Sequence, residues 1–253
     1  MKPIVIVKAG VTFPWMARTL NDFEHWTARA MGLSMAEVRV VSAVQGERPP
    51  EPEGVGAVVV TGSHSMVTNR ETWSERLAVW IEKVVENRVP FLGICYGHQL
   101  LAHATGGRVG YLLRGREIGT VRVRLTVAGR ADPLLGGLPA EFPAHASHQQ
   151  TVLELPRGAT LLAESEEEPH HSFRIGPAAW GVQFHPEFDT RVMLAYISAQ
   201  EEEHLREGRD LPALRAGVVN TPDASSLPRR FVALARGSGC SEGVQVPAGI
   251  SQP

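Results

Sequence analysis

The chain has 253 residues, of which 43% are hydrophobic and 21% are charged, and its formal net charge is −2. This composition predicts a protein with a full hydrophobic core, built as one α/β domain with an appendage. Because Lys and Arg are spread along the chain, we expect neither a nucleic acid nor an anionic membrane as partner. No apolar run approaches the ~18 residues that span a membrane, and the first residues do not resemble a signal peptide.

The number of cysteines indicates the redox state of the cellular compartment in which the protein works. Cys95 and Cys240 are the two cysteines, too few for a disulfide framework. A lone cysteine accompanied by distant histidines suggests a nucleophile in a reducing compartment. We therefore expect a cytoplasmic protein.

The first part of the chain predicts parallel strands. Short β-branched runs at residues 4–7, 38–44 and 55–60 are typical of strands that are buried on both faces of a parallel sheet. Residues 72–75, Thr-Trp-Ser-Glu, read as a capping box that starts an amphipathic helix, which should end before Pro90. A strand, a helix and a strand in this order predict a parallel crossover.

The second part has a different pattern. Residues 118–127 alternate apolar and polar side chains, as in a half-exposed strand. Further short strand signals, separated by Gly and Pro turns, occur at residues 151–155, 160–163, 172–175 and 178–184. Residues 190–206 predict a helix whose acidic run, 201–203, is interpreted as a solvated face rather than a metal site.

Together these elements predict the fold class and the domain organisation. We expect an open, mostly parallel sheet with helices on both faces, and a smaller antiparallel sheet laid against it. Residues 1–207 should form one domain. Residues 208–253 should form a C-terminal extension, with a short helix around 231–234 and a disordered tail from 237 that is rich in Gly, Ser and Pro.

Cys95 is the strongest candidate for a reactive residue. It lies between Gly93 and Gly97, directly after the apolar run 89–92 and before a helix. This is the arrangement of a nucleophile elbow with sulfur in place of a serine oxygen, in which the sharp turn admits only glycine at both flanking positions. The N-terminus of the following helix favours the thiolate. The alternative is a buried structural cysteine.

A cysteine nucleophile needs a general acid and base, and an oxyanion hole. Among ten histidines, only His185 has a carboxylate, Glu187, two residues away at the end of a strand. A hydrogen-bonded surface histidine is the alternative. The N–H of Tyr96 can supply one oxyanion donor, and the glycine-containing loop 61–65 can supply the second, unless it is an ordinary strand-to-helix turn.

These motifs resemble the class I glutamine amidotransferase family, of the Cys-His-Glu type. The resemblance runs from the first strand to about residue 200 and rests on Gly-Ile-Cys-Tyr-Gly-His-Gln at 93–99 and Gln-Phe-His-Pro-Glu at 183–187. It implies a flavodoxin-like fold that needs no metal or cofactor. The implied roles are nucleophile for Cys95, acid and base for His185, its orienting carboxylate for Glu187, oxyanion N–H donors for Gly62 and Tyr96, and glutamine binding for Gln99, Ser147, His148 and Gln149.

The sequence departs from the family pattern at two places. The stretch 147–158 resembles Ser-His-x-Asp-x-Val…Leu-Pro-x-Gly, but Gln150 replaces the aspartate. The oxyanion loop reads Thr-Gly-Ser at 61–63, where many members have Gly-Gly-Pro. The second glycine is retained, so the rigidity of the loop is more in question than its function.

The resemblance also implies a reaction. The thiolate would attack the side-chain amide of glutamine and form a γ-glutamyl thioester, with ammonia and then glutamate as products. Only three lysines exist and none lies in a P-loop, so the chain has no ATP-activating motif of that kind. We expect a free-standing glutaminase, similar to the glutaminase part of GMP synthase, that serves a separate ATP-dependent synthetase. A γ-glutamyl hydrolase or peptidase and a binding module with little turnover remain alternatives.

Overall fold

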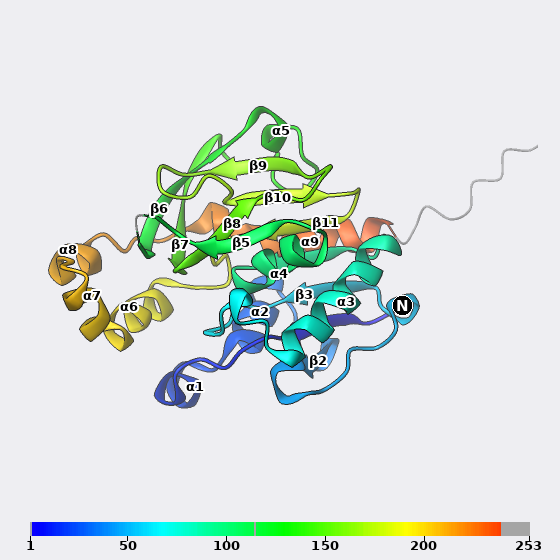
Figure 1. The fold of residues 1–253 in the computed structure, drawn as a ribbon, viewed down its shortest axis with the longest axis horizontal. Coiled ribbons are helices and arrows are strands. Elements are labelled where there is room, and N and C mark those ends of the chain that lie inside the picture. The colour runs from blue at the N-terminus through cyan, green and yellow to red at the C-terminus, as the bar shows by residue number, and fades with distance from the viewer. Residues whose placement is uncertain (1, 114, 239–253) are drawn as a thin grey trace, which may run out of the picture.

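A nine-stranded sheet runs through the part of the chain that the computed structural model describes, residues 2–113 and 115–238 (Figure 1). Its strand order is β2-β1-β3-β4-β11-β10-β9-β6-β7. The strands are β1 (Ile4–Lys8), β2 (Val38–Ser42), β3 (Ala57–Val60), β4 (Phe91–Ile94), β6 (Glu117–Leu125), β7 (Glu141–His148), β9 (Thr160–Glu164), β10 (Ser172–Ile175) and β11 (Ala179–Val182). A separate two-stranded sheet pairs β5 (Arg108–Tyr111) with β8 (Gln150–Glu154).

The large sheet has a parallel half and an antiparallel half. Strands β2, β1, β3, β4 and β11 pair in parallel, and β10, β9, β6 and β7 continue the sheet in antiparallel pairs. This confirms the predicted α/β class with a mostly parallel core and a smaller antiparallel sheet. The antiparallel strands are hydrogen-bonded to the parallel ones, so they extend the core sheet as well as cover it.

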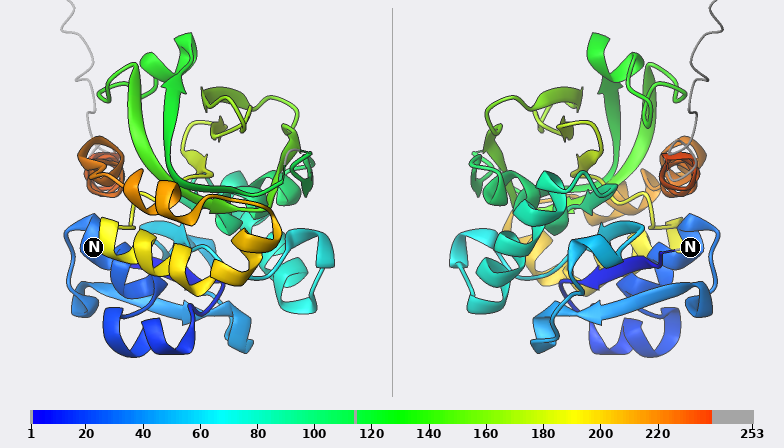
Figure 2. Two further views of the ribbon diagram at one scale, coloured as in Figure 1. Left: turned by 90° about the vertical axis from the view of Figure 1, so that its left-hand side faces the viewer. Right: turned by 90° about the vertical axis from the view of Figure 1, so that its right-hand side faces the viewer.

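Helices lie on both faces of the sheet (Figure 2). They are α1 (Pro14–Leu20), α2 (Phe23–Met31), α3 (Thr72–Glu86), α4 (Tyr96–Ala104), α5 (Val127–Arg130), α6 (Thr190–Ala199), α7 (Glu201–Arg206), α8 (Leu211–Ala216) and α9 (Pro222–Ser238). Helices α6, α7 and α8 contact one another and form a layer near the end of β6 (Figures 1 and 2).

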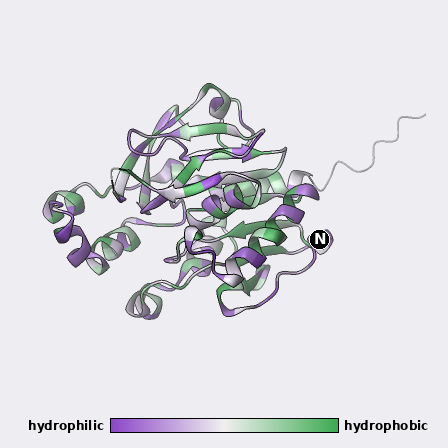
Figure 3. Cartoon of the chain, viewed as in Figure 1, coloured by the Kyte–Doolittle hydropathy of each residue, from purple (hydrophilic) through white to green (hydrophobic). Residues whose placement is uncertain are grey.

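The two faces of the parallel strands bury different helices. Successive side chains of a strand point to opposite faces, so Val5 and Val7 pack with α3 and α4, whereas Ile4 and Ile6 pack with α2 and α9. These side chains are almost fully buried. The strands of the core are mostly hydrophobic, and the helices carry both hydrophobic and hydrophilic residues (Figure 3). The expectation that the early strands are buried on both faces is therefore confirmed.

Two helix boundaries differ from the prediction. The predicted capping box at Thr72 is wrong: α3 begins at this residue and its N-cap is Glu71, so the Thr72 side chain is already inside the helix and cannot cap it. The predicted helix 190–206 is two helices, because the backbone at Gln200 leaves the helical conformation (φ −111°, ψ 20°).

The C-terminal region is more ordered than predicted. The short helix expected around residues 231–234 is part of α9, a helix of 17 residues that contacts α2 and β7 and buries Leu227 and Phe231. Of the predicted tail, Gly237 and Ser238 end α9 and the rest lies outside the described residues. The boundary at residue 207 stays a prediction.

Strands β5 and β7 were not predicted. Strand β7 contains Pro143 and has few β-branched residues, and it lies at the edge of the sheet, where proline is tolerated because no partner needs its N–H. Its pairing with β6, from Glu117 opposite His148 to Arg124 opposite Glu141, is what brings residues 147–149 to the candidate site.

Candidate active site

Cys95 lies in a strained turn between β4 and α4. Its φ is 49° and its ψ is −98°, a backbone conformation that residues other than glycine rarely adopt. A Cβ at Gly93 would lie 2.3 Å from the carbonyl oxygen of Gly97, and a Cβ at Gly97 would lie 2.5 Å from the carbonyl oxygen of Val60. Both positions therefore require glycine, as the elbow pattern predicts.

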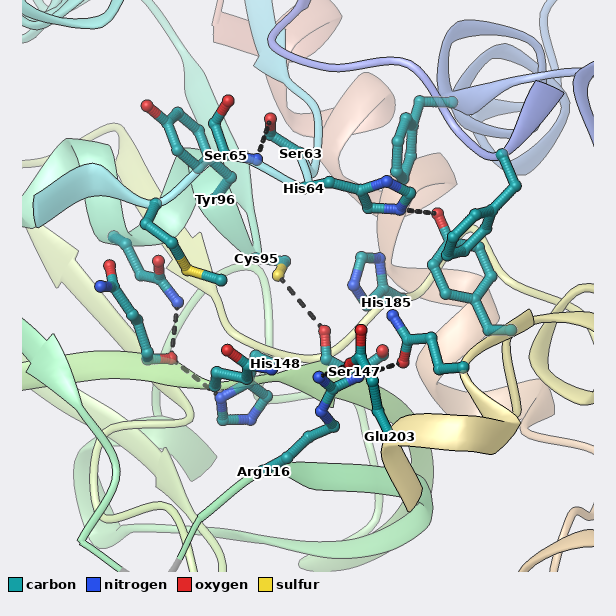
Figure 4. Close-up of a pocket in the computed structure, with 18 residues that line it drawn as sticks. Ser63, His64, Ser65, Cys95, Tyr96, Arg116, Ser147, His148, His185 and Glu203 are labelled. Atoms are coloured by element: carbon teal, nitrogen blue, oxygen red, sulfur yellow. Dashed lines mark hydrogen bonds and ion pairs between the residues drawn. The ribbon is translucent and has the colours of Figure 1, made fainter. Parts of the chain in front are cut away.

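The turn presents Cys95 to a cavity of about 340 Å³ (Figure 4). The cavity lies at the carboxyl ends of the parallel strands, where open α/β sheets bind ligands. Its lining residues are Phe13, Phe23, Ser63, His64, Ser65, Met66, Cys95, Tyr96, Gln99, Arg116, Ser147, His148, Gln149, Gln150, His185, Tyr196, Gln200 and Glu203. The sequence-predicted residues Gln99, Ser147 and Gln149 are thus brought together with Cys95 and His185.

His185 lies between a carboxylate and the thiol. Its Nδ1 is 2.8 Å from Oε1 of Glu187, and its ring stacks on Phe188 with 4.0 Å between centroids. Burial by itself would lower the pKa of His185, but the charges of Glu187 and Cys95 and the hydrogen bonds to both outweigh burial and raise the pKa to about 10. Because Nδ1 faces Glu187, Nε2 is the ring nitrogen left to bond Cys95.

Side-chain hydrogen bonds and close packing against His185 hold the loop around Gly62. A Cβ at Gly62 would lie 3.0 Å from Cε1 of His185 and would crowd the imidazole. The hydroxyl of Thr61 accepts a hydrogen bond from the N–H of Ala9 at 3.0 Å, and that of Ser63 accepts one from the N–H of Ser65 at 3.0 Å. These bonds fix the loop in the absence of the Gly-Gly-Pro sequence.

Gln99 is oriented by the protein. Its Nε2 donates to the carbonyl oxygen of Gln150 at 2.7 Å and to Oε1 of Gln183 at 2.9 Å. The side-chain oxygen of Gln99 is consequently the atom that can accept a hydrogen bond from a ligand. The carbonyl oxygen of Ser147 is 3.9 Å from Sγ of Cys95, so residues 147–149 form the wall opposite the elbow.

His148 differs from the other predicted ligand-binding residues. It is buried, and both of its ring nitrogens already have partners: Nε2 is 2.8 Å from Oε2 of Glu117, and Nδ1 is 2.9 Å from the carbonyl oxygen of Gln150. Burial opposes the charge of His148, but the bond to Glu117 outweighs it and raises its pKa. Its ring therefore holds the cavity wall.

Several lining residues were missed from the sequence. His64, whose pKa is lowered by burial, is part of the loop around Gly62, and its Nε2 is 3.1 Å from the hydroxyl of Tyr196. Glu203 belongs to the acidic run that was expected to be solvated; its side chain is 46% exposed, but it also pairs with Arg116 on the cavity wall. No local spacing connects positions 87 residues apart, so the sequence carried no signal for this pair.

Neither a metal site nor a membrane span was found in the described part of the chain. Within residues 2–113 and 115–238, no three His, Cys, Asp or Glu side chains are grouped so that they could hold a metal ion. In the same ranges no helix is both long enough and apolar enough to cross a bilayer.

Comparison with known proteins identifies the family. The model of the family "Glutamine amidotransferase class-I" matches residues 21–201. The chain belongs to the class I glutamine amidotransferase family. This amidotransferase domain is 34% identical over 169 residues to a GMP synthase [glutamine-hydrolyzing] of Porphyromonas gingivalis, a match that covers 66% of the chain but 32% of that protein. It is 30% identical over 161 residues to gamma-glutamyl peptidase 3 of Arabidopsis thaliana, covering 61% of the chain and 64% of the peptidase.

Solved structures share the amidotransferase fold. A glutamine amidotransferase from Thermotoga maritima superposes with a TM-score of 0.73 at 24% identity, covering 93% of this chain and 98% of that one. A glutamine amidotransferase from Methylobacillus flagellatus gives a TM-score of 0.68 at 23% identity, covering 93% and 90%. At these identities the similarity shows the fold. The chain spans about one third of the length of the GMP synthase that it matches.

Proposed function

We propose that the chain hydrolyses the side-chain amide of glutamine through a thioester on Cys95. The observation that supports this most is the position of His185, which is held by Glu187 at 2.8 Å and lines the same cavity as Cys95. An imidazolium in this place can protonate the leaving nitrogen, and the neutral imidazole can then activate water.

In the first half-reaction, the sulfur of Cys95 attacks the carboxamide carbon and the carbonyl electrons move to oxygen. The N–H groups of Gly62 and Tyr96 would stabilise this oxyanion. The C–N bond then breaks, nitrogen takes the proton of the His185 imidazolium, and ammonia leaves. The products of this step are a γ-glutamyl thioester and a neutral imidazole.

In the second half-reaction, His185 takes a proton from water as the water oxygen attacks the thioester carbon. The C–S bond breaks, the thiolate of Cys95 is restored beside the imidazolium, and glutamate leaves. Glu187 holds the ring and stabilises its charge throughout, without exchanging a proton itself. Every proton and electron pair in the cycle is supplied by the chain, water and substrate.

The ammonia would be used by a separate ATP-dependent synthetase. The 34% identity to a GMP synthase [glutamine-hydrolyzing] supports a glutaminase whose ammonia is used in a synthesis. A restrained resting rate would avoid free ammonia, so we expect slow hydrolysis by the chain alone and a faster rate with the synthetase bound. Since a free cysteine nucleophile needs a reducing environment, the cytoplasm suits this role.

A γ-glutamyl peptidase is the second candidate. The match to gamma-glutamyl peptidase 3 covers 64% of that protein, a larger share than for the GMP synthase. The same thioester chemistry would then release an amine or a peptide in place of ammonia. The mechanism is unchanged, and the difference lies in which leaving group the cavity mouth admits.

A substrate panel tests both candidates. Purified chain is incubated with L-glutamine, γ-glutamyl dipeptides and γ-glutamyl alkylamides, and release of ammonia or amine is measured, with Cys95→Ala as the control. We expect release of ammonia from glutamine, and none by the variant. Fast turnover of the peptides with glutamine as a poor substrate would establish the peptidase, and equal rates for Cys95→Ala and the wild type would refute both.

A further inference from the structure

Two side chains of opposite permanent charge line the cavity. The described residues that line the cavity include one arginine, Arg116, and one glutamate, Glu203, but no Asp and no Lys. The Arg116 side chain is 4% exposed and that of Glu203 is 46% exposed. Figure 4 shows them with Ser147 on one side of Cys95, while Ser63 and His64 lie on the other.

Arg116 is fixed from several directions. Its guanidinium contacts the side-chain oxygen of Gln200 and the carboxylate of Glu203, and Nε is 3.7 Å from Oε1 of Glu207. Arg209 donates a hydrogen bond to the carbonyl oxygen of Arg116. A guanidinium that is held in this way is preorganised for a further partner, because little side-chain entropy remains to be lost on binding.

The strand register places Arg116 beside the expected glutamine-binding segment. Glu117 lies opposite His148 at the end of this pairing, so Arg116 directly precedes it and Gln149 directly follows it, and both line the cavity. The carboxamide of a bound glutamine must reach Cys95. Its other end, which carries a carboxylate and an ammonium group, then has to lie against another part of the same cavity.

We propose that Arg116 binds the α-carboxylate and Glu203 the α-ammonium group of the substrate, which makes the site selective for γ-glutamyl compounds with a free amino acid end. This inference rests on the proposed amide hydrolysis. A guanidinium presents parallel N–H donors that match a carboxylate, and a carboxylate accepts from an ammonium group. A zwitterion meets both charges at once, so neither Arg116 nor Glu203 is left without a partner when it binds.

The competing explanation is that the pair only attaches α7 to the sheet. In that case its loss would lower activity equally for every substrate, because the cavity wall would move. Recognition of the α-substituents would instead lower activity only for substrates that carry the group concerned. The two explanations therefore differ in substrate discrimination rather than in overall rate.

The first test uses the unmodified protein. Ammonia release is measured from L-glutamine, from 4-aminobutanamide, which lacks the carboxylate, and from 5-amino-5-oxopentanoate, which lacks the amino group. We expect kcat/KM to fall about 10²-fold for each analogue, as for the loss of a charge-assisted hydrogen bond. Values within threefold of that for glutamine would overturn the proposal.

The second test uses Arg116→Gln and Glu203→Gln, with Arg122→Gln as control, since Arg122 is an exposed residue of β6. For Arg116→Gln the preference for glutamine over 4-aminobutanamide should fall from about 10²-fold to about onefold, and Glu203→Gln should do the same for 5-amino-5-oxopentanoate. Arg122→Gln should keep both preferences. Uniform losses with unchanged preferences would overturn the proposal in favour of a structural role.

A third measurement separates this inference from the proposed function. The rate of alkylation of Cys95 is followed with 6-diazo-5-oxo-L-norleucine, which carries the amino acid end of glutamine, and with iodoacetamide, which does not. Arg116→Gln should slow the first reagent about 10²-fold and leave the second unchanged. This readout needs no turnover, so absence of ammonia release would refute the hydrolysis alone, while equal effects on both reagents would refute the role of Arg116.

Discussion

Two buried histidine–carboxylate pairs face the same cavity and differ in what they leave free. His185 and Glu187 are neighbours in the chain, with 2.8 Å between Nδ1 and Oε1, and Nε2 is left for Cys95. His148 and Glu117 lie opposite each other on antiparallel strands, also 2.8 Å apart, but the second nitrogen of His148 is bonded to the backbone. The first pair can transfer a proton to a ligand, and the second cannot do so without breaking its own bonds.

The second pair is also part of a larger buried cluster. Oε2 of Glu117 lies 3.1 Å from Nε2 of His171, and its Oε1 accepts a hydrogen bond from Ser165 at 3.0 Å. Burial opposes the charge of Glu117, but the bonds to His148 and His171 outweigh burial and lower its pKa. An imidazole–carboxylate distance alone therefore does not identify a general base, because the second ring nitrogen must also be free to bond the reacting group.

The largest expected difference between the two pairs is in turnover. His185→Asn should lower kcat for glutamine about 10⁶-fold, as does loss of the base in other triads. His148→Asn should cost at most about 10²-fold, because it removes support for the wall and not a proton carrier. Ammonia release by the two variants, with circular dichroism to confirm folding, measures this. Equal losses would show that the two pairs act as one unit.

A smaller effect should follow from the orienting carboxylate. Glu187→Gln should lower kcat about 10⁴-fold, less than His185→Asn, because Glu187 holds the imidazolium without exchanging a proton. The measurement is the same assay under saturating glutamine. A loss as large as that of His185→Asn would indicate a more direct role for the carboxylate.

The Glu117 cluster should affect folding more than chemistry. Glu117→Gln should reduce the free energy of unfolding by about 3 kcal/mol, because it breaks a buried ion pair and leaves the partner unpaired. Denaturant unfolding measures this change, with Glu164→Gln as the control, since Glu164 pairs with the exposed Arg124 on the surface. An unchanged midpoint for Glu117→Gln would mean that the cluster contributes nothing to stability.

The shifted pKa values of His148 and Glu117 determine how the contribution of this cluster to stability depends on pH. The raised pKa of His148 stabilises the fold fully below the ordinary value of 6.5 and loses effect at higher pH, as the pH passes through the folded value. The lowered pKa of Glu117 stabilises the fold fully above 4.5 and loses effect as the pH falls through its folded value. The stability difference between wild type and Glu117→Gln should therefore be greatest between these two values.

The smallest expected effect concerns the pH profile of turnover. With the pKa of His185 raised to about 10, kcat/KM for glutamine should begin to fall only near that pH, as the imidazolium loses its proton. In Glu187→Gln, this high-pH limb should move to lower pH because the stabilising charge is removed. A wild-type limb near the ordinary histidine value of 6.5 would show that the charges of Glu187 and Cys95 do not act as described.

The sequence predicted those parts of the fold and of the candidate site that depend on local pattern. The β-branched runs in β1 and β3 and the apolar stripe of α3 identified the parallel core, and Gly93, Cys95 and Gly97 identified the elbow. Strand β7 was missed because its edge position, which its partner β6 provides, compensates for weak propensity and for Pro143. Helix α9 was underestimated because its buried stripe is stabilised by α2 and β7, to which the local sequence gives no clue.

Steric and chemical rules that act over a few residues let the sequence alone specify a cysteine between two obligatory glycines and a histidine with a carboxylate two positions away. Which distant groups meet depends on the tertiary structure. The pairing of β6 with β7 joins Glu117 to His148, and α7 brings Glu203 to Arg116 across 87 residues. Such contacts depend on strand register and helix packing, which are properties of the whole folded chain, so no spacing within one segment encodes them.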